Sequence, residues 1–229
     1  MEIRRVKKHD VDMTSGSVFR HLLNFAVPLL MGNIFQQLYN TVDTWVVGNY
    51  VSNEAFSAVG TVAPIINTLI GAFSGLASGA GVVISQYYGA GKYDRVKDAV
   101  HTAVMMTLVL SVAFTAIGIA MTPNMLRLMK TPAEVFPESR AYLNIYFSGM
   151  AGLMLYNMGA GILRAVGDSK RPFYYLVCAA VINTVLDLVF VIAFGMGVEG
   201  VAYATIIDHA YAAQERILCP CGAEAYQAS

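Results

Sequence analysis

The sequence predicts an all-α membrane protein, a polytopic transmembrane helix bundle with five complete spans and a truncated sixth. Two observations lead to this prediction. The chain of 229 residues is 56% hydrophobic and 13% charged, with a mean hydropathy of +0.55, which is too apolar for a water-soluble domain. Its apolar residues also gather in runs long enough to cross a hydrocarbon core of about 30 Å.

Composition also excludes several other classes of protein. The formal net charge is zero, so no basic field predicts nucleic acid as a partner. The three cysteines, Cys178, Cys219 and Cys221, are odd in number and clustered, and they form no disulfide framework. A zinc site needs about four ligands, and the tail offers only Cys219, Cys221 and the distant His209. We therefore expect no cofactor.

The first span, 22–47, follows a polar and basic arm, 1–20, and is too long for a signal peptide, so we expect it to remain as an uncleaved anchor. Four polar residues share an arc of about 80° on this helix. They are Asn33, Gln36, Asn40 and Asp43. A carboxylate at bilayer depth costs at least about 2.5 kcal/mol, so Asp43 should face the bundle interior or water. Pro28 bends the helix, either as an ordinary kink or as a hinge that moves in function.

The next three spans are expected at 55–87, 100–121 and 141–163. In the first of these, Gly71, Gly75 and Gly79 recur every four residues, a ridge that lets another helix approach closely. The link 122–140 contains three prolines and should hold a short helix at the membrane surface. Asn157, in the third of these spans, should face inward.

The fifth span, 173–194, places Asn183 and Asp187 four residues apart and hence on one helix face. The sixth apolar stretch, 200–207, reaches only about 12 Å before it meets Asp208 and His209. That length does not cross a bilayer. We therefore interpret 208–229 as a non-native or disordered tail.

Basic residues predict the orientation. With the amino terminus inside, the inner segments contain eleven Lys and Arg residues, whereas the outer ones contain only Arg127, Lys130 and Arg140. The positive-inside rule therefore places the amino terminus in the cytoplasm.

Asp43 and Asp187 are the residues from which we expect chemistry. Both lie in the outer halves of their spans, so their depths match. Two close carboxylates can share a proton, and with the neighbouring amide and hydroxyl oxygens they can also bind a hard monovalent cation. Those neighbours are Tyr39, Asn40, Asn183 and Thr205. The structural alternative is a hydrogen-bonded polar cluster that only fixes the helix register.

Four segments in order resemble the amino-terminal lobe of the multidrug and toxic compound extrusion (MATE) family, over residues 21–207. They are FAVPLLMGNIFQQLYNTVDTWVVG (25–48), GILRAVGDSKRP (161–172), INTVLDLVF (182–190) and GVEGVAYATI (197–206). The resemblance implies one half of an antiporter with twelve helices in two lobes. In such a transporter, entry of protons or sodium ions drives export of organic, often cationic, drugs across the bacterial inner (plasma) membrane.

The resemblance also implies roles for particular residues. The cation-binding or proton-coupling positions of the family match Tyr39, Asp43, Asn183, Asp187 and Thr205, of which the last four would hold sodium. Gln36 and Asn157 resemble residues that line the substrate cleft, and Pro28 resembles the proline near which the first helix bends.

The expected partners are the lipid bilayer, small organic cations or drugs, and a second lobe that this chain lacks. Alternating access needs two lobes, so half a transporter has no second gate. A nonfunctional truncated product and a lipid-linked flippase of the same superfamily remain alternatives. We do not expect an enzyme, because the string before Asp168 lacks the first glycine of the Gly-x-Gly-Asp signature of intramembrane aspartyl proteases.

Overall fold

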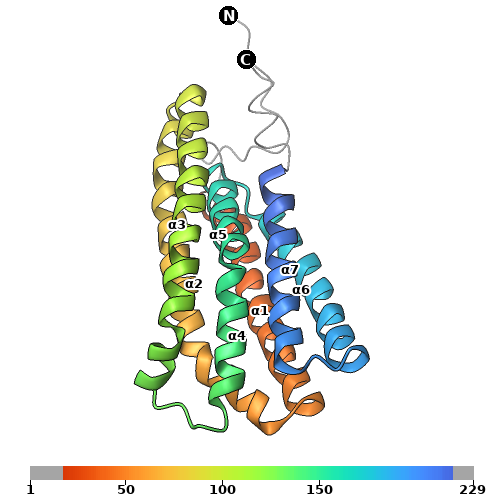
Figure 1. Cartoon of the computed structure of the whole chain (residues 1–229). Helices are drawn as coiled ribbons and strands as arrows, with labels where there is room; N and C mark the ends of the chain where they lie inside the picture. Colours follow the sequence, from red (N-terminus) through yellow and green to blue (C-terminus); the bar gives the residue numbers. More distant parts are fainter. Residues whose placement is uncertain (1–17, 219–229) are drawn as a thin grey trace, which may run out of the picture.

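The computed structural model describes residues 18–218, which form a bundle of seven α-helices and one π-helical segment (Figure 1). Most of the predicted basic arm, together with Cys219 and Cys221, lies outside the described residues. The elements are α1 (Val18–Tyr50), α2 (Asn53–Gly89), α3 (Tyr93–Leu128), α4 (Phe136–Ser148), α5 (Met150–Ala165), α6 (Lys170–Leu188), η1 (Val189–Ala193) and α7 (Gly197–Leu218).

The helices run between two ends of the bundle, and the connections alternate between those ends. The α1–α2, α3–α4 and η1–α7 links lie at one end, and the α2–α3 and α5–α6 links at the other (Figure 1). The second end includes six basic residues, namely Lys92, Arg95, Lys97, Arg164, Lys170 and Arg171. At that end, the Asp168 carboxylate accepts hydrogen bonds from the backbone N–H groups of Lys170 and Arg171 and so caps α6.

The predicted fourth span, 141–163, is two helices rather than one. α4 ends at Ser148 and α5 begins at Met150, and Gly149 lies between them. A Cβ at Gly149 would collide with the side chain of Ile206 on α7. Glycine therefore allows α7 to approach the junction closely. The predicted surface helix in the link 122–140 is also absent, because α3 continues through Pro123 to Leu128 and α4 begins at Phe136.

The truncation predicted at Ile207 is not a structural boundary. α7 continues through Asp208 and His209 to Leu218, for a total of 22 residues. Ala212 and Ala213 are buried and pack with Tyr156, Leu176 and Ala179. Contacts with α5 and α6 therefore stabilise this part of α7, although its sequence is less apolar than that of the preceding residues. Residues 208–218 therefore differ from the predicted disordered tail.

The span count of five plus a truncated sixth is not confirmed. Among residues 18–218, three segments have the length and hydropathy of a membrane span, namely 53–89, 93–128 and 170–193. α1 is 33 residues long, but its polar residues lower its hydropathy. The interrupted α4–α5 pair consists of two short helices of 13 and 16 residues.

The glycine ridge on α2 does not pack as predicted. A Cβ added at Gly71, Gly75 or Gly79 would meet no atom within 4 Å. Close packing occurs instead at Gly161 of α5, where a Cβ would lie 2.8 Å from the carbonyl oxygen of Ala77 on α2. The close contact between α2 and α5 therefore involves Gly161 and Ala77 rather than the ridge that the spacing indicated.

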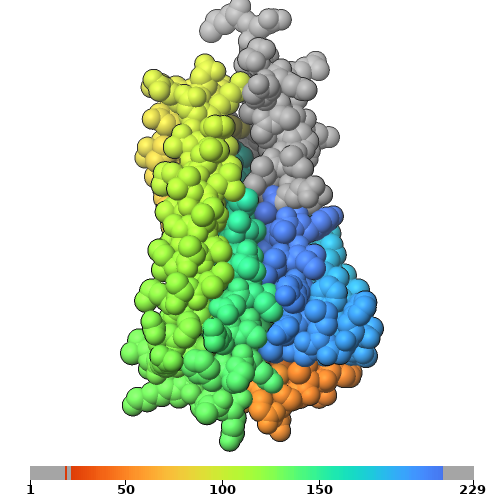
Figure 2. Space-filling model, viewed as in Figure 1, coloured from red at the N-terminus to blue at the C-terminus, as the bar shows by residue number. Residues whose placement is uncertain are grey.

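The surface differs between helices. α3 and α6 expose mainly large apolar side chains, including Val109, Val112, Val181 and Val185. Figure 2 shows α3, α4 and α7 side by side on one face, with the α1–α2 connection protruding beneath α6 and α7. Apart from Phe56, Val82 and Val83, the exposed residues of α2 are smaller or more polar, among them Gly60, Asn67, Thr68, Gly71, Gly75 and Ser78.

Candidate functional site

Two carboxyl groups meet inside the bundle, one from α1 and one from α6. The side chain of Asp43 is 9% exposed and that of Asp187 is fully buried. The two groups lie within direct interaction range of each other. Because ionised carboxylates only accept hydrogen bonds, a proton between them would supply the one donor that this contact requires. The pair can thus hold a positive charge.

Of the other predicted cation residues, Asn183 and Tyr39 lie one turn from the two acids on α6 and α1, and Thr205 lies on α7. Asn183, one turn before Asp187 on α6, is fully buried, and neither its amide nitrogen nor its carbonyl oxygen has a hydrogen-bond partner among the described residues. Thr205 is buried on α7, where its hydroxyl donates to the Val201 carbonyl at 2.9 Å. Tyr39 is partly exposed on α1 and lies within electrostatic range of Asp43. The predicted cation residues thus come from α1, α6 and α7.

The backbone changes its helical form just after Asp187. α6 ends at Leu188, and the next five residues, Val189–Ala193, form the π-helix η1. Short π-helical segments often occur at functional sites because they leave backbone groups available and reorient nearby side chains. Tyr142 of α4 lies within electrostatic range of both acids and stacks on Tyr146, with ring centroids 6.4 Å apart.

The donor set suits a monovalent cation better than a transition metal. It combines carboxylate, amide and hydroxyl oxygens, which hard cations prefer. Among the described residues, no group of three or more His, Cys, Asp and Glu side chains is arranged to hold a metal ion. The unpaired carbonyl oxygen of Asn183 and the unpaired oxygens of Asp187 are compatible with a bound sodium ion or with protonation.

The predicted substrate-lining residues, Gln36 and Asn157, do not line the larger pocket found beside α1. Gln36 is partly buried, and Asn157 is partly buried with its amide donating to the Leu153 carbonyl at 2.9 Å. Neither is among the residues that line the pocket described next. Pro28 lies within the continuous helix α1 and borders a smaller pocket of about 200 Å³ together with Lys170 and Phe173.

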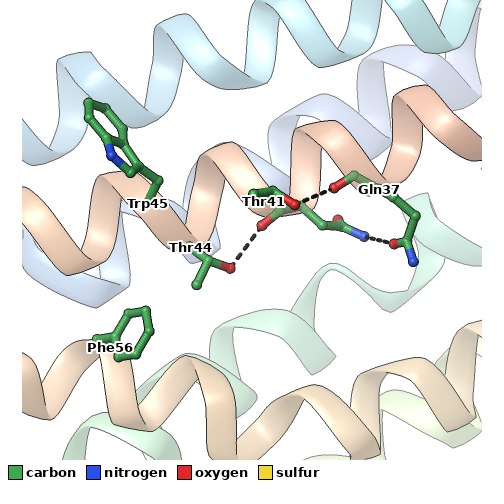
Figure 3. Close-up of a pocket in the computed structure, with 6 residues that line it drawn as sticks. Gln37, Thr41, Thr44, Trp45 and Phe56 are labelled. Carbon is green, nitrogen blue, oxygen red and sulfur yellow. Dashed lines mark hydrogen bonds between the residues drawn. The ribbon is translucent and has the colours of Figure 1, made fainter.

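An open pocket of about 480 Å³ lies between α1 and the start of α2 (Figure 3). Its lining residues are Gln37, Asn40, Thr41, Thr44, Trp45 and Phe56. The hydroxyl of Thr41 donates to the Gln37 carbonyl and that of Thr44 to the Asn40 carbonyl, both at 2.8 Å. The amide of Asn40 donates to the side-chain oxygen of Gln37 at 3.3 Å. The pocket therefore combines neutral polar groups with two aromatic rings.

Sequence reasoning missed several residues of this region. Gln37, Thr41 and Thr44 lie one position away from the predicted polar stripe, and their exposure depends on how α1 rotates in the bundle. Asn33 and Asn40 of that stripe are exposed, whereas Asp43 is buried. Asp208 was assigned to the tail, but it is a buried residue of α7. Its spacing of three residues from Thr205 was the available signal.

The chain resembles proteins from one family. The family model described as MatE matches residues 28–189. The probable multidrug resistance proteins YpnP and YoeA of Bacillus subtilis (strain 168) are 33% and 38% identical, over 88% and 84% of this chain. These matches span 45% and 42% of the two relatives, so the chain spans about half their length. A solved outward-facing multidrug resistance MATE family transporter of the MOP superfamily has a TM-score of 0.85 at 25% identity, over 93% of this chain and 48% of that one.

Proposed function

The chain belongs to the MatE family of multidrug efflux transporters, and from this premise we propose that it forms one lobe of an antiporter. The complete transporter would export organic, often cationic, compounds in exchange for protons or sodium ions. The observation that carries this proposal is the contact between Asp43 and Asp187 inside the bundle. Two buried carboxyl groups in contact are costly unless a cation or a proton neutralises them.

The geometry of α1 supports a mechanism that couples ion binding to export. Asp43 is directed into the bundle, while the adjacent Thr44 and the preceding Asn40 and Thr41 line the pocket between α1 and α2. Because Asp43 and these pocket residues belong to the same helix, a shift of α1 on cation binding would also change the shape of the pocket. Pro28 would serve as the point of bending, since its ring removes one backbone hydrogen bond.

The pocket chemistry supports a cationic aromatic substrate. Trp45 and Phe56 offer ring faces, and the other lining residues are uncharged, so no basic side chain repels a cation there. A cation over an aromatic ring gains about 0.5–1 kcal/mol at an exposed site. The YpnP and YoeA relatives are named as probable multidrug resistance proteins, which is compatible with such a cargo.

The chain would lie in the bacterial plasma membrane with its amino terminus in the cytoplasm. The six basic residues at the end of the bundle that includes the start of α1 support this orientation. The exposed small and polar residues of α1 and α2 would meet the second lobe, which in the relatives corresponds to the half that this chain does not span.

Ion and substrate binding by the reconstituted chain test the proposal, because one lobe without a second gate can bind but not export. The chain is reconstituted in liposomes, and binding of a fluorescent organic cation is followed as sodium or acid is added. We expect Asp43→Asn to abolish the effect of the coupling ion while the protein still inserts, and we expect Asp168→Asn, at the α6 cap, to retain it. If wild type binds neither the coupling ion nor the organic cation, the proposal fails.

A further inference from the structure

The smaller pocket beside Pro28 is a groove between α1 and the start of α6. Its lining residues are Val27, Pro28 and Met31 of α1 and Lys170, Phe173 and Tyr174 of α6. Its volume is about 200 Å³. Sites for drug-sized molecules usually have volumes of about 300–1,000 Å³. The groove therefore fits only part of a ligand, and the remainder of that ligand would extend along the surface of the protein.

Contacts between α1 and α6 close this groove on the side of the bundle centre. The rings of Phe35 and Phe173 pack edge to face, with centroids 5.7 Å apart. A Cβ at Gly32 would lie 3.6 Å from the side chain of Leu176, so the two helices are in van der Waals contact just past Met31. The groove thus lies between this contact and the basic end of the bundle, where the α5–α6 link is found.

The walls of the groove are mostly apolar and face away from the protein interior. Val27, Met31 and Tyr174 are 50%, 40% and 63% exposed. At about 100° per residue, the groove residues of α1 point on average roughly 120° away from the α1 residues that line the larger pocket. The groove is therefore separate from the substrate pocket, and in a membrane its exposed apolar side chains would meet lipid chains, which are as apolar as they are.

One positive charge lies at the rim of the groove. Lys170 is exposed, and within residues 18–218 it forms no ion pair. The nearest acid in the sequence, Asp168, is already engaged, because it pairs with Arg171 at 3.2 Å and accepts the backbone N–H groups of Lys170 and Arg171. The ammonium group of Lys170 is thus available to an anion that enters the groove.

We propose that this groove binds one anionic phospholipid, with its phosphate beside the Lys170 ammonium and an acyl chain along Val27, Pro28 and Met31. Basic pockets between transmembrane helices are recurring sites for acidic lipid head groups. Tyr174 adds an aromatic ring of the kind that favours the head-group level of a bilayer. The inference is independent of the proposed antiport, because it requires only that the bundle lies in a membrane.

Charge complementarity favours this occupant over two others. A zwitterionic phospholipid would cover the same apolar walls but would bring no net negative charge to Lys170. A soluble phosphate ion would meet the charge but would leave Val27, Met31 and Tyr174 uncovered. An anionic phospholipid satisfies both parts of the groove, and its second chain would remain in the bilayer.

Quenching by brominated lipids tests the site. Trp45 is the single tryptophan of the chain, so combining Trp45→Phe with Tyr174→Trp leaves one tryptophan, which lies in the groove. The full chain in detergent is titrated with phosphatidylglycerol that has brominated chains and, separately, with phosphatidylcholine that has the same chains. We expect phosphatidylglycerol to quench the emission at a concentration about fivefold lower, as expected for one lysine beside an anionic head group.

Variants of the basic residues distinguish the groove from the general positive charge of this end. Lys170→Gln should remove the preference for phosphatidylglycerol, and Lys170→Arg should keep it. Lys92→Gln is the matched control, because Lys92 is an exposed lysine at the same end of the bundle and does not line the groove. Inorganic phosphate at constant ionic strength should not relieve the quenching.

Several results would overturn the inference. They are equal quenching by the two lipids, an unchanged preference in Lys170→Gln, an equal loss of preference in Lys92→Gln, and relief of the quenching by inorganic phosphate. Where the chain with Tyr174→Trp does not fold, the thermal midpoint of wild type and of Lys170→Gln is measured with each lipid. Only wild type should then be stabilised more by phosphatidylglycerol than by phosphatidylcholine, and the same rise in Lys170→Gln would refute the site.

Discussion

Asn183 and Asp187 lie one turn apart on α6, and both side chains are completely buried with oxygen atoms that no described residue hydrogen-bonds. Polar groups in this state are rare in folded proteins unless a ligand, an ion or a proton completes them. Their position next to Asp43, and immediately before the π-helix η1, gives α6 the central place in the candidate site.

Asp187→Asn removes one carboxyl group of the acidic pair and keeps the shape of the side chain. We expect sodium to raise the thermal midpoint of wild type in detergent and to leave that of the variant unchanged, because an ion stabilises only a protein that binds it in the folded state. The midpoint is measured with and without sodium at constant pH and ionic strength. Asp168→Asn, at the α6 cap, is the control and should respond as wild type does. A variant midpoint that rises with sodium as much as that of wild type would contradict the assignment.

Gly149→Ala tests the close contact between the α4–α5 junction and α7. The new Cβ would collide with Ile206, so we expect a loss of about 1–3 kcal/mol in the free energy of unfolding. Gly75→Ala is the matched control, because its Cβ would meet no atom within 4 Å and alanine favours the helix by up to about 1 kcal/mol. Combining Gly149→Ala with Ile206→Ala should recover part of the loss. Equal midpoints for the two glycine variants would argue against the contact.

Glu138 predicts a pH dependence of stability at the end of the bundle that includes the α3–α4 link. Burial raises the pKa of the Glu138 carboxyl above its ordinary value of 4.5, and the charge of Glu54 raises it further. A raised pKa in the folded state means that folding favours the protonated form. Its contribution is therefore fully present below pH 4.5 and is lost as the pH rises through the folded-state pKa.

Replacing that carboxyl group should remove this dependence. We expect Glu138→Gln to be more stable than wild type at neutral pH, with the difference shrinking toward acid. Thermal unfolding at several pH values measures the difference, and Glu134→Gln, an exposed residue of the preceding link, serves as the control. A difference that grows toward acid would reverse the sign and refute the prediction.

Thiol labelling tests which faces contact water. Cys178 lies on α6 on one face with the exposed Tyr174, Val181 and Val185, so we expect lipid to shield it from a charged maleimide. Thr41→Cys, in the α1 pocket, should react when Cys219 and Cys221 are replaced by serine. The rate of labelling in liposomes is measured, and detergent should expose Cys178 to the reagent. Equal rates in liposomes would contradict the assignment of these faces.

The sequence by itself determined the class of the protein and most of the candidate cation residues. Low charge and long apolar runs exclude a soluble fold. In lipid the backbone N–H and C=O groups must pair within each span, so the spans are helices. Spacing of four residues placed Asn183 and Asp187 on one face, because the period of the helix is local. The family likeness carried by 25–48 and 182–190 agrees with the family model that matches 28–189.

Tertiary structure alone decided the rest, because contacts between helices depend on how each helix rotates and where its neighbours lie. The break between α4 and α5 lies where Ile206 of another helix comes so close to Gly149 that no side chain fits there. The continuation of α7 past Ile207 depends on packing against α5 and α6. The ridge of Gly71, Gly75 and Gly79 has helical spacing but no close neighbour among residues 18–218. Asp208 likewise is a buried residue only because α7 continues past Ile207 and packs within the bundle, which no local pattern encodes.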